Sequence, residues 1–342
     1  MCLNASWPTP KPRVRISRIL LSLTNRNSLP RTLGALCLWA FTIVPPANGQ
    51  VHEWQPGDTI IGKPTWVTTA YEDTFAGIGE NRGFGFLEMV RANPDVDPWL
   101  PGDGTRIRLP SRRILPSGPH EDIVINLAEF RLYHFRDDQV VTYPVGIGNS
   151  STPSPLTRTS VRMRLESPAW YPPESIQEEA AEEGRKLPAE IPPGPSNPLG
   201  PFALQLEEDG YLIHGTNKRF GVGQRVSHGC IRMFNDDIEE LVWATPKGSD
   251  VRIVDEPVKA AVQGNTIWLQ VHGQKETLSE ADRDRLWRQA ETALEGIRRN
   301  EPRVEIYRGR VEDAVERASG LAVRVGMVVD KAPGWRYWRS SR

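Results

Sequence analysis

One cysteine and two histidines of this chain have the residue types and spacing of a nucleophilic site. His214 ends an apolar run, and beyond the loop 215–226 the sequence reads Ser-His-Gly-Cys, with His228 two residues before Cys230. A thiol with an ordinary pKa of about 8.5 is only a few per cent ionised at pH 7, so it needs a base within hydrogen-bond reach. Either imidazole can supply that base. The pattern therefore predicts Cys230 as a nucleophile.

The residues around this cysteine are suited to hold the oxyanion of an acyl-transfer intermediate. Gly229 lets the backbone approach a substrate closely, and the N–H groups of His228, Gly229 and Cys230 are candidate oxyanion donors. One such donor is typically worth about 3 kcal/mol of transition-state stabilisation. Ser227 is expected to line the pocket and to position His228; as a nucleophile it is the poorer candidate because a hydroxyl needs stronger activation than a thiol.

The same side chains leave a second chemistry open. His228 and Cys230 face the same side of an extended chain, which suits one pocket or a shared metal ion. Two histidines and a cysteine can hold a catalytic zinc, so a zinc hydrolase using His214, His228 and Cys230 is a competing interpretation. We expect no metal and no other cofactor.

Short β-branched and aromatic runs must position these residues. Residues 121–256 contain the runs IVINL, EFRLYHF and QVVTYPVGIG, the last after an Asp137-Asp138 turn, and this spacing predicts a mainly antiparallel β domain. A helix capped by Asn235 is expected to follow the cysteine. Residues 167–200 are rich in Pro, Glu and Gly with one helix at 175–183, which favours a lid or binding loop over a solvated connector.

Smaller units are expected on both sides of the β domain. Residues 65–110 read as a β-α-α-β module, with Asp73 as the first helix cap. Residues 257–342 read as a small α/β extension with a strand at 266–271, a helix at 279–299 and a second helix at 311–319 ending before Gly320. The longer helix carries a Ser-x-x-Asp capping box.

The leader and the overall charge limit where the protein works and what it binds. The 342 residues carry 42 basic and 43 acidic side chains, a balance that argues against a nucleic-acid partner. Residues 1–49 are basic and then apolar from Leu33 to Val44, as in a signal peptide, with cleavage expected before Gln50 and export to the periplasm. An uncleaved leader would instead anchor the chain in the inner membrane. Cleavage removes Cys2 and Cys37, so Cys230 is the single cysteine of the mature chain.

The motif and its surroundings resemble a known family. HGTNKRFGVGQRVSHGCIRM, together with IVINLAEFRLYHF, YPVGIG, TPSPLT and PAEIPPGPSNPLGPFALQL, is similar to the L,D-transpeptidase catalytic domain of the YkuD type, in its periplasmic branch. This resemblance implies a β-sandwich-like catalytic domain. Residues 65–110 resemble a LysM module, a family that binds N-acetylglucosamine-containing glycans.

The resemblance also implies a reaction and roles for residues. Cys230 would attack a peptidoglycan tetrapeptide stem at diaminopimelate and release D-Ala, with His214 as proton acceptor and donor, the Gly215 carbonyl orienting that imidazole, and Arg232 pairing with a stem carboxylate. The acceptor would be another stem, giving a 3-3 cross-link, or the C-terminal Lys of an outer-membrane lipoprotein. Hydrolysis by an L,D-carboxypeptidase or amidase, and a non-enzymatic peptidoglycan-binding role in the envelope, remain alternatives.

Overall fold

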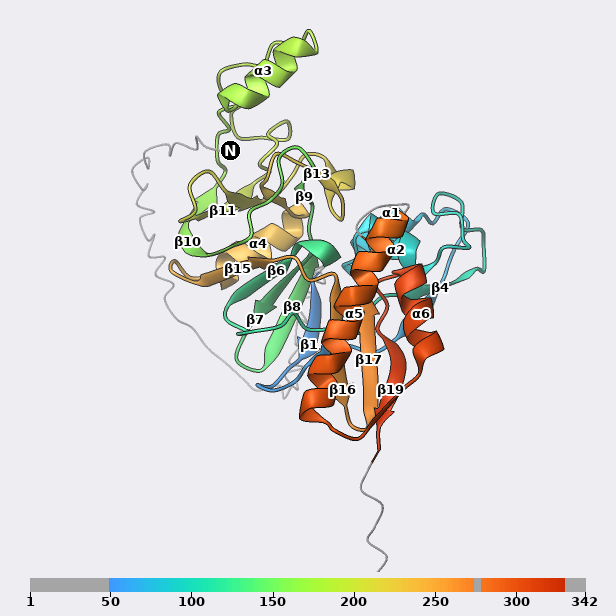
Figure 1. Cartoon of the computed structure of the whole chain (residues 1–342). Helices are drawn as coiled ribbons and strands as arrows, with labels where there is room; N and C mark the ends of the chain where they lie inside the picture. Colours follow the sequence, from blue (N-terminus) through green and yellow to red (C-terminus); the bar gives the residue numbers. More distant parts are fainter. Residues whose placement is uncertain (1–48, 274–277, 330–342) are drawn as a thin grey trace, which may run out of the picture.

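The described residues form three packed units. The computed structural model describes residues 49–273 and 278–329, which show a mainly β body with a projecting insertion and two flanking modules (Figure 1). Apart from Gly49, the predicted signal peptide lies outside the described residues, as do residues 330–342. Strand β1 (Gln50–Glu53) begins at the residue where the mature chain is predicted to start.

One curled sheet forms the central body. Its strand order is β1, β8 (Gln139–Pro144), β7 (Arg131–Phe135), β6 (Ile123–Asn126), β15 (Asp250–Val254), β10 (Thr157–Glu166), β11 (Phe202–Leu206), β12 (Leu212–His214) and β14 (Ile231–Arg232). The long β10 pairs with β15 through its first half and with β11 through its second, and a bulge between Val161 and Met163 separates the halves. A bulge bends and twists a strand, which accounts for the curl. The expectation of a mainly β domain is confirmed.

The pairing is less uniformly antiparallel than the sequence suggested. β12 pairs with β14 in parallel, as do β15 with β6 and β13 (Arg225–Ser227) with β9 (Ile147–Gly148). Hairpin spacing indicates only neighbours joined by short turns, whereas the chain after β12 loops back through η2 (Arg219–Gly221) to start β14 in the same direction. Helix α4 (Asn235–Ala244) packs on this half of the sheet and contributes to its apolar core.

The first flanking module has the predicted β-α-α-β order. It comprises β3 (Thr65–Thr68), α1 (Phe75–Arg82), α2 (Phe86–Ala92) and β4 (Arg106–Leu109), with β3 and β4 paired antiparallel. Phe75, Phe84 and Met89 fill its small core. The cap of α1 is Thr74 rather than Asp73, because the Thr74 hydroxyl accepts from the Gly77 N–H. The short strands β2 (Ile60–Ile61) and β5 (Arg113–Ile114) lead from this module towards the body.

The second flanking module follows the body. Its four-stranded sheet has the order β16 (Val258–Gln263), β17 (Thr266–Val271), β19 (Val323–Val328), β18 (Val304–Ile306), and α5 (Glu280–Asn300) and α6 (Arg308–Arg317) pack on it (Figure 1). The predicted capping box is present, since Ser279 and Asp282 bond each other's backbone N–H. Helix α6 ends earlier than expected, with Ala318 rather than a glycine in the left-handed conformation at its end.

Buried charges join the three units. Glu88 of α2 pairs with Arg113 at 2.8 Å and with Arg131 of the body at 2.5 Å, all three being almost completely buried. Burial opposes ionisation of Glu88, but the two guanidiniums hold its pKa below the usual range. On the other side, Lys259 of β16 pairs with buried Glu129 at 2.5 Å. The flanking modules are therefore fixed to the body rather than tethered to it.

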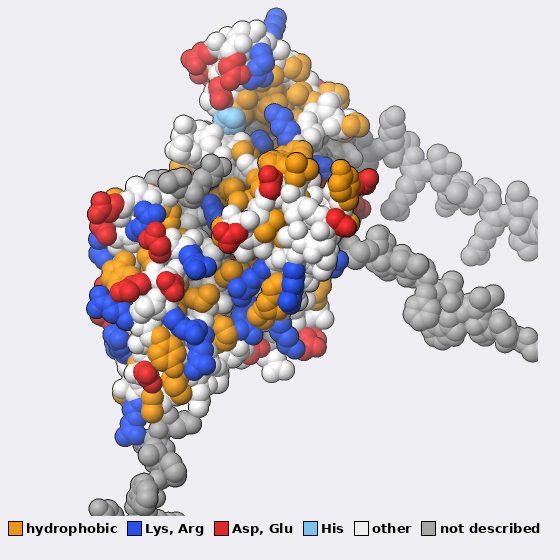
Figure 2. All heavy atoms as spheres, turned by 90° about the vertical axis from the view of Figure 1, so that its right-hand side faces the viewer, with side chains coloured by type: hydrophobic (Ala, Val, Ile, Leu, Met, Phe, Trp, Pro, Cys, Tyr) orange, Lys and Arg blue, Asp and Glu red, His pale blue; other side chains and the backbone are white. Residues whose placement is uncertain are grey.

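The outer surface carries both signs of charge. Figure 2 shows basic and acidic side chains interspersed over the face formed by the flanking modules. Among the described residues, no helix is long and apolar enough to cross a bilayer.

Candidate active site

The register of the parallel pair β12 and β14 determines how His214 and Cys230 lie relative to each other. Ile213 pairs with Ile231 and His214 with Arg232, so Cys230 lies one residue before the paired segment, beside Leu212. The Leu212 N–H donates to the Cys230 sulfur at 3.4 Å. Residues two apart on a strand share a face, and partners in a parallel pair point to the same side. Cys230, His214 and Arg232 therefore lie on one face of the sheet.

His214 is held as a neutral base. Its Nδ1 lies 2.6 Å from the Gly215 carbonyl oxygen, and because a carbonyl can only accept, Nδ1 carries the proton and Nε2 is the basic atom. Burial lowers the pKa of His214 to about 4 and the Arg232 cation acts in the same direction, while backbone hydrogen bonds with Gly215 and Leu199 oppose them. The imidazole is neutral at pH 7 and is able to take a proton.

The Gly215 position has no room for a side chain. A Cβ there would lie 2.5 Å from the Asn235 Oδ1, which accepts from the Thr216 N–H at 2.8 Å. The prediction that Asn235 caps α4 is wrong: Phe234 is the cap residue, and the Asn235 side chain turns back to fix the backbone after His214. That contact spans nineteen positions of sequence and has no local signal.

The Ser-His-Gly-Cys segment is a tight turn fixed by hydroxyl groups. Ser227 donates to the Cys230 carbonyl at 2.5 Å. It therefore does not position His228, contrary to the prediction from the sequence. The reason is geometric, since Ser227 is buried while the His228 side chain points towards the insertion. Gly229 has φ of +102°, a conformation that side chains rarely adopt, and a Cβ there would approach the Tyr211 ring to 3.0 Å.

The insertion covers the site, as expected of a lid. It carries α3 (Glu174–Glu182), which projects from the body (Figure 1), and the His228 Nε2 lies 2.6 Å from the Glu179 carboxylate of this helix. Trp170 and Leu199, from its two ends, pack in the small apolar cluster that contains Cys230. Only 1% of the Cys230 surface and 4% of the His214 surface are exposed. Glu179 gives no sequence signal as a site residue, because it is one of several glutamates in α3.

Arg232 is a cation on the same face of the sheet as His214 and Cys230. Among residues 49–273 and 278–329, no carboxylate forms an ion pair with its guanidinium, and its Nε is buried without a hydrogen-bond partner. Burial lowers its pKa. A desolvated guanidinium in this position is suited to receive a carboxylate from a ligand.

The geometry gives no support to the zinc interpretation. No group of three His, Cys, Asp or Glu side chains in the described part of the chain is placed to hold a metal ion. His214 faces the Gly215 carbonyl through Nδ1, and His228 is engaged with Glu179. The two imidazoles therefore do not converge with the thiol on one point.

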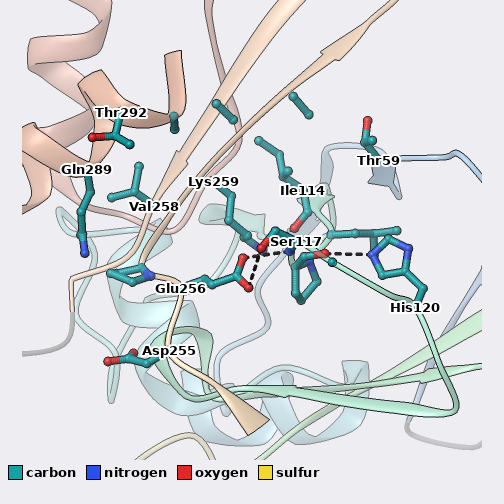
Figure 3. Close-up of a pocket in the computed structure, with 17 residues that line it drawn as sticks. Thr59, Ile114, Ser117, His120, Asp255, Glu256, Val258, Lys259, Gln289 and Thr292 are labelled. Carbon is teal, nitrogen blue, oxygen red and sulfur yellow. Dashed lines mark hydrogen bonds between the residues drawn. The ribbon is translucent and has the colours of Figure 1, made fainter. Parts of the chain in front are cut away.

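A separate cavity of about 660 Å³ lies between the body and the C-terminal module. It is lined by β5, the segment after it, the start of β16 and helix α5 (Figure 3). There the Glu256 carboxylate accepts from the N–H and the hydroxyl of Ser117, and His120 Nε2 lies 2.8 Å from the Pro116 carbonyl oxygen. Neither Cys230 nor His214 lines it, so it is not part of the candidate active site.

Comparisons with known proteins match the chain to one family. Residues 120–253 match the family model of the L,D-transpeptidase catalytic domain. The chain is 36% identical over 279 residues to the probable L,D-transpeptidase ErfK/SrfK of Salmonella typhimurium, covering 79% of this chain and 88% of the relative, and 37% identical over 245 residues to the probable L,D-transpeptidase YbiS of Escherichia coli, covering 70% and 79%. Among solved structures, L,D-transpeptidase 3 of Mycobacterium tuberculosis is 16% identical, with a TM-score of 0.29, over 45% of this chain and 76% of that one.

Proposed function

This chain belongs to the L,D-transpeptidase family of acyl-transferring enzymes that act on peptidoglycan, and we propose that Cys230 is its nucleophile and a tetrapeptide stem its acyl donor. The observation that supports this proposal is the pairing of β12 with β14, in whose register Cys230 and a neutral His214 share one face of the sheet. A nucleophile, a base and a group that orients the base are the parts that acyl transfer through a thioester requires.

The proposed reaction has two steps, acylation of Cys230 and transfer of the acyl group to an acceptor. In the first, His214 takes the thiol proton, Cys230 sulfur bonds to the carbonyl carbon between diaminopimelate and D-Ala, and the peptide C–N bond breaks as His214 returns the proton to the leaving amine. In the second, an acceptor amine bonds to the thioester carbonyl carbon, its proton passes to His214, and the C–S bond breaks as His214 returns that proton to the sulfur. The N–H groups of Gly229 and Cys230 are the proposed donors to the oxyanion of both steps.

Burial of the site favours an amine over water as the acceptor. A thioester on Cys230 would be covered by Trp170 and Leu199, and a covered site protects a reactive intermediate from hydrolysis. We therefore place transpeptidation, to a second stem or to the terminal Lys of a lipoprotein, ahead of the carboxypeptidase alternative. Arg232 is the proposed partner of a stem carboxylate. The periplasmic location, the signal peptide and the glycan affinity of residues 65–110 stay predictions.

Muropeptide turnover tests the proposal. The purified enzyme is incubated with tetrapeptide muropeptides, with and without a peptide ending in Lys, and the products are identified by mass spectrometry. We expect an acyl adduct on Cys230 and either a 3-3 dimer or a peptide-linked acceptor, neither of which forms with Cys230→Ala.

The products separate the alternatives. A bare tripeptide as the sole product would indicate the carboxypeptidase, and turnover that survives alkylation of the thiol but not chelation would indicate a metal enzyme. The absence of any product and of any adduct on the wild-type enzyme would overturn the assignment and leave the peptidoglycan-binding role.

A further inference from the structure

Strand β9 and the loop that follows it, residues 147–154, hold the turn that contains Cys230. The Asn149 N–H donates to the Ser227 carbonyl at 2.9 Å. The Ser154 hydroxyl lies 2.8 Å from the Gly229 carbonyl oxygen and 2.9 Å from the Gly148 nitrogen, and Ser154 itself is buried. These contacts join segments about 75 positions apart and bond the carbonyls of Ser227 and Gly229 in the turn that ends in Cys230.

The direction of the two hydrogen bonds of Ser154 is fixed by chemistry. A backbone N–H only donates and a carbonyl only accepts, so the Ser154 oxygen accepts from Gly148 and gives its single proton to the Gly229 carbonyl. A Cβ on Gly148 would lie 2.4 Å from the Ser154 nitrogen, so the two backbones approach as closely as a glycine permits. The hydroxyl is therefore a fixed bridge rather than a freely rotating group.

The bridge determines which way one peptide group points. In a trans peptide the carbonyl and the N–H point in opposite directions, so holding the Gly229 carbonyl towards Ser154 aims the Cys230 N–H away from it. On the other side of Cys230, the Ser227 hydroxyl holds the next carbonyl at 2.5 Å. Two buried serines thus fix the two successive peptide groups that flank the nucleophile.

The turn needs such a clamp because of Gly229. A glycine with φ of +102° rotates its peptide groups more easily than any other residue, and the turn must have a glycine there because a Cβ would meet the Tyr211 ring. The local backbone therefore does little to fix the orientation of the peptide between Gly229 and Cys230, and a hydrogen bond from another segment must fix it.

We propose that Ser154 is a positioning residue that aims the Cys230 N–H at the oxyanion by holding the Gly229 carbonyl. This inference rests on the proposed acyl transfer and deepens it. Ser154 touches neither the thiol nor His214 among the contacts of the described residues, so it acts through the backbone alone.

Two reactions of the same thiol separate this role from a general structural one. Acylation by a tetrapeptide develops an oxyanion, whereas alkylation by iodoacetamide displaces iodide at a saturated carbon and develops none. Losing a whole oxyanion donor slows acylation about 100- to 1,000-fold, so a donor that is only misdirected should slow it about 10- to 100-fold. For Ser154→Ala we expect this loss in the single-turnover acylation rate, with KM and the alkylation rate within about threefold of the wild type.

Two further variants complete the experiment. Ser154→Thr keeps the hydroxyl and should acylate at least about threefold faster than Ser154→Ala. Ser151→Ala, in the same loop but exposed, should behave as the wild type. A single-turnover rate constant does not depend on the amount of folded enzyme, so partial unfolding of a variant does not imitate the effect.

The outcomes are distinguishable. Acylation of Ser154→Ala within threefold of the wild-type rate, or alkylation slowed in parallel with acylation, would overturn the positioning role while leaving the nucleophile in place. No adduct on wild-type Cys230 would overturn the proposed function and this inference with it.

Discussion

Replacing Arg232 by glutamine tests whether the guanidinium beside His214 receives a carboxylate of the stem. The side chain lies on the same face of the sheet as the thiol and is desolvated, and within the described residues it pairs with no acidic group. A protein that keeps an unbalanced, partly buried cation next to its reactive groups leaves a place for an anion. The stem brings carboxylates, and the variant removes the charge while keeping hydrogen-bond donors.

The expected effect follows from the strength of a charged hydrogen bond. Such a bond is worth about 1.5–3 kcal/mol, so the KM for a tetrapeptide should rise by about 10- to 150-fold in Arg232→Gln. The cation also helps burial to lower the pKa of His214, so its removal should raise that pKa and move the acid limb of the acylation rate to higher pH. The shift is upward because a neutral neighbour no longer disfavours the imidazolium.

Substrate chemistry makes the test specific. Acylation is measured with the free tetrapeptide and with peptides amidated at each carboxylate in turn, in the wild type and in Arg232→Gln. If the guanidinium binds one carboxylate, the two changes will not be additive at that position. Arg162→Gln, an exposed arginine on β10, is the matched control and should leave every rate unchanged. Equal losses for all peptides in Arg232→Gln, with no coupling to any carboxylate, would refute the reasoning.

Three further predictions follow from buried or bridging charges. Glu179→Gln should leave the free energy of unfolding within about 1 kcal/mol, because its hydrogen bond with His228 is half exposed. The variant should nevertheless raise amide exchange over α3, an effect that Glu178→Gln should not reproduce. Glu88→Gln strands two buried arginines and should destabilise the fold by about 3–5 kcal/mol in urea unfolding, whereas Glu121→Gln, from an exposed pair, should change it by less than about 1 kcal/mol; equal effects would contradict the buried network. Burial lowers the pKa of four histidines to about 3 or 4, so in the window from pH 6.5 to 4 the unfolded chain binds protons that the folded chain does not, and stability should fall as the pH falls. Burial raises the pKa of Asp237 to about 8, so the folded chain keeps one proton that the unfolded chain has lost. Near pH 5 the free energy of unfolding, measured with urea, should therefore rise with pH by an amount that corresponds to about three protons. A free energy of unfolding that does not change with pH would contradict this prediction. These four are His52, His134, His214 and His272.

Local signals in the sequence were sufficient for the elements. The β-branched run at 266–271 is β17, and the Ser279 and Asp282 pattern is a capping box in the structure, because both depend on residues a few positions apart. The motif around Cys230 also predicted the family, which the match of residues 120–253 to the L,D-transpeptidase catalytic domain confirms. Where a prediction concerned a helix end, as at Asp73 and Asn235, a neighbouring residue took the cap.

Contacts between distant segments were not predictable in this way. The parallel pairing that brings Cys230 beside Leu212, the bond from Ser154 to Gly229 and the bond from Glu179 to His228 each join residues that no periodicity connects. A serine hydroxyl bonds whichever carbonyl the fold brings near, and one glutamate of an acidic helix resembles the next. Local sequence patterns show which residue types are present, but the tertiary fold determines which hydrogen-bond partner each of them meets.

The strands around Cys230 and the insertion that covers it are held by different kinds of contact. The nucleophile strand β14 is short, yet it is bonded on one side to β12 and on the other to Gly146, whose N–H and carbonyl each bond Arg232 at 2.8 Å. The insertion contacts this frame through side chains, including the Asn217 amide on the Ser196 carbonyl, Glu179 on His228, and Trp170 and Leu199 in the cluster that contains Cys230. Because Cys230 is covered while these contacts hold, we expect the proposed donor and acceptor to enter as the insertion opens. On this basis we expect the hydrogen-bonded frame to hold the reacting groups and the insertion to control access to them.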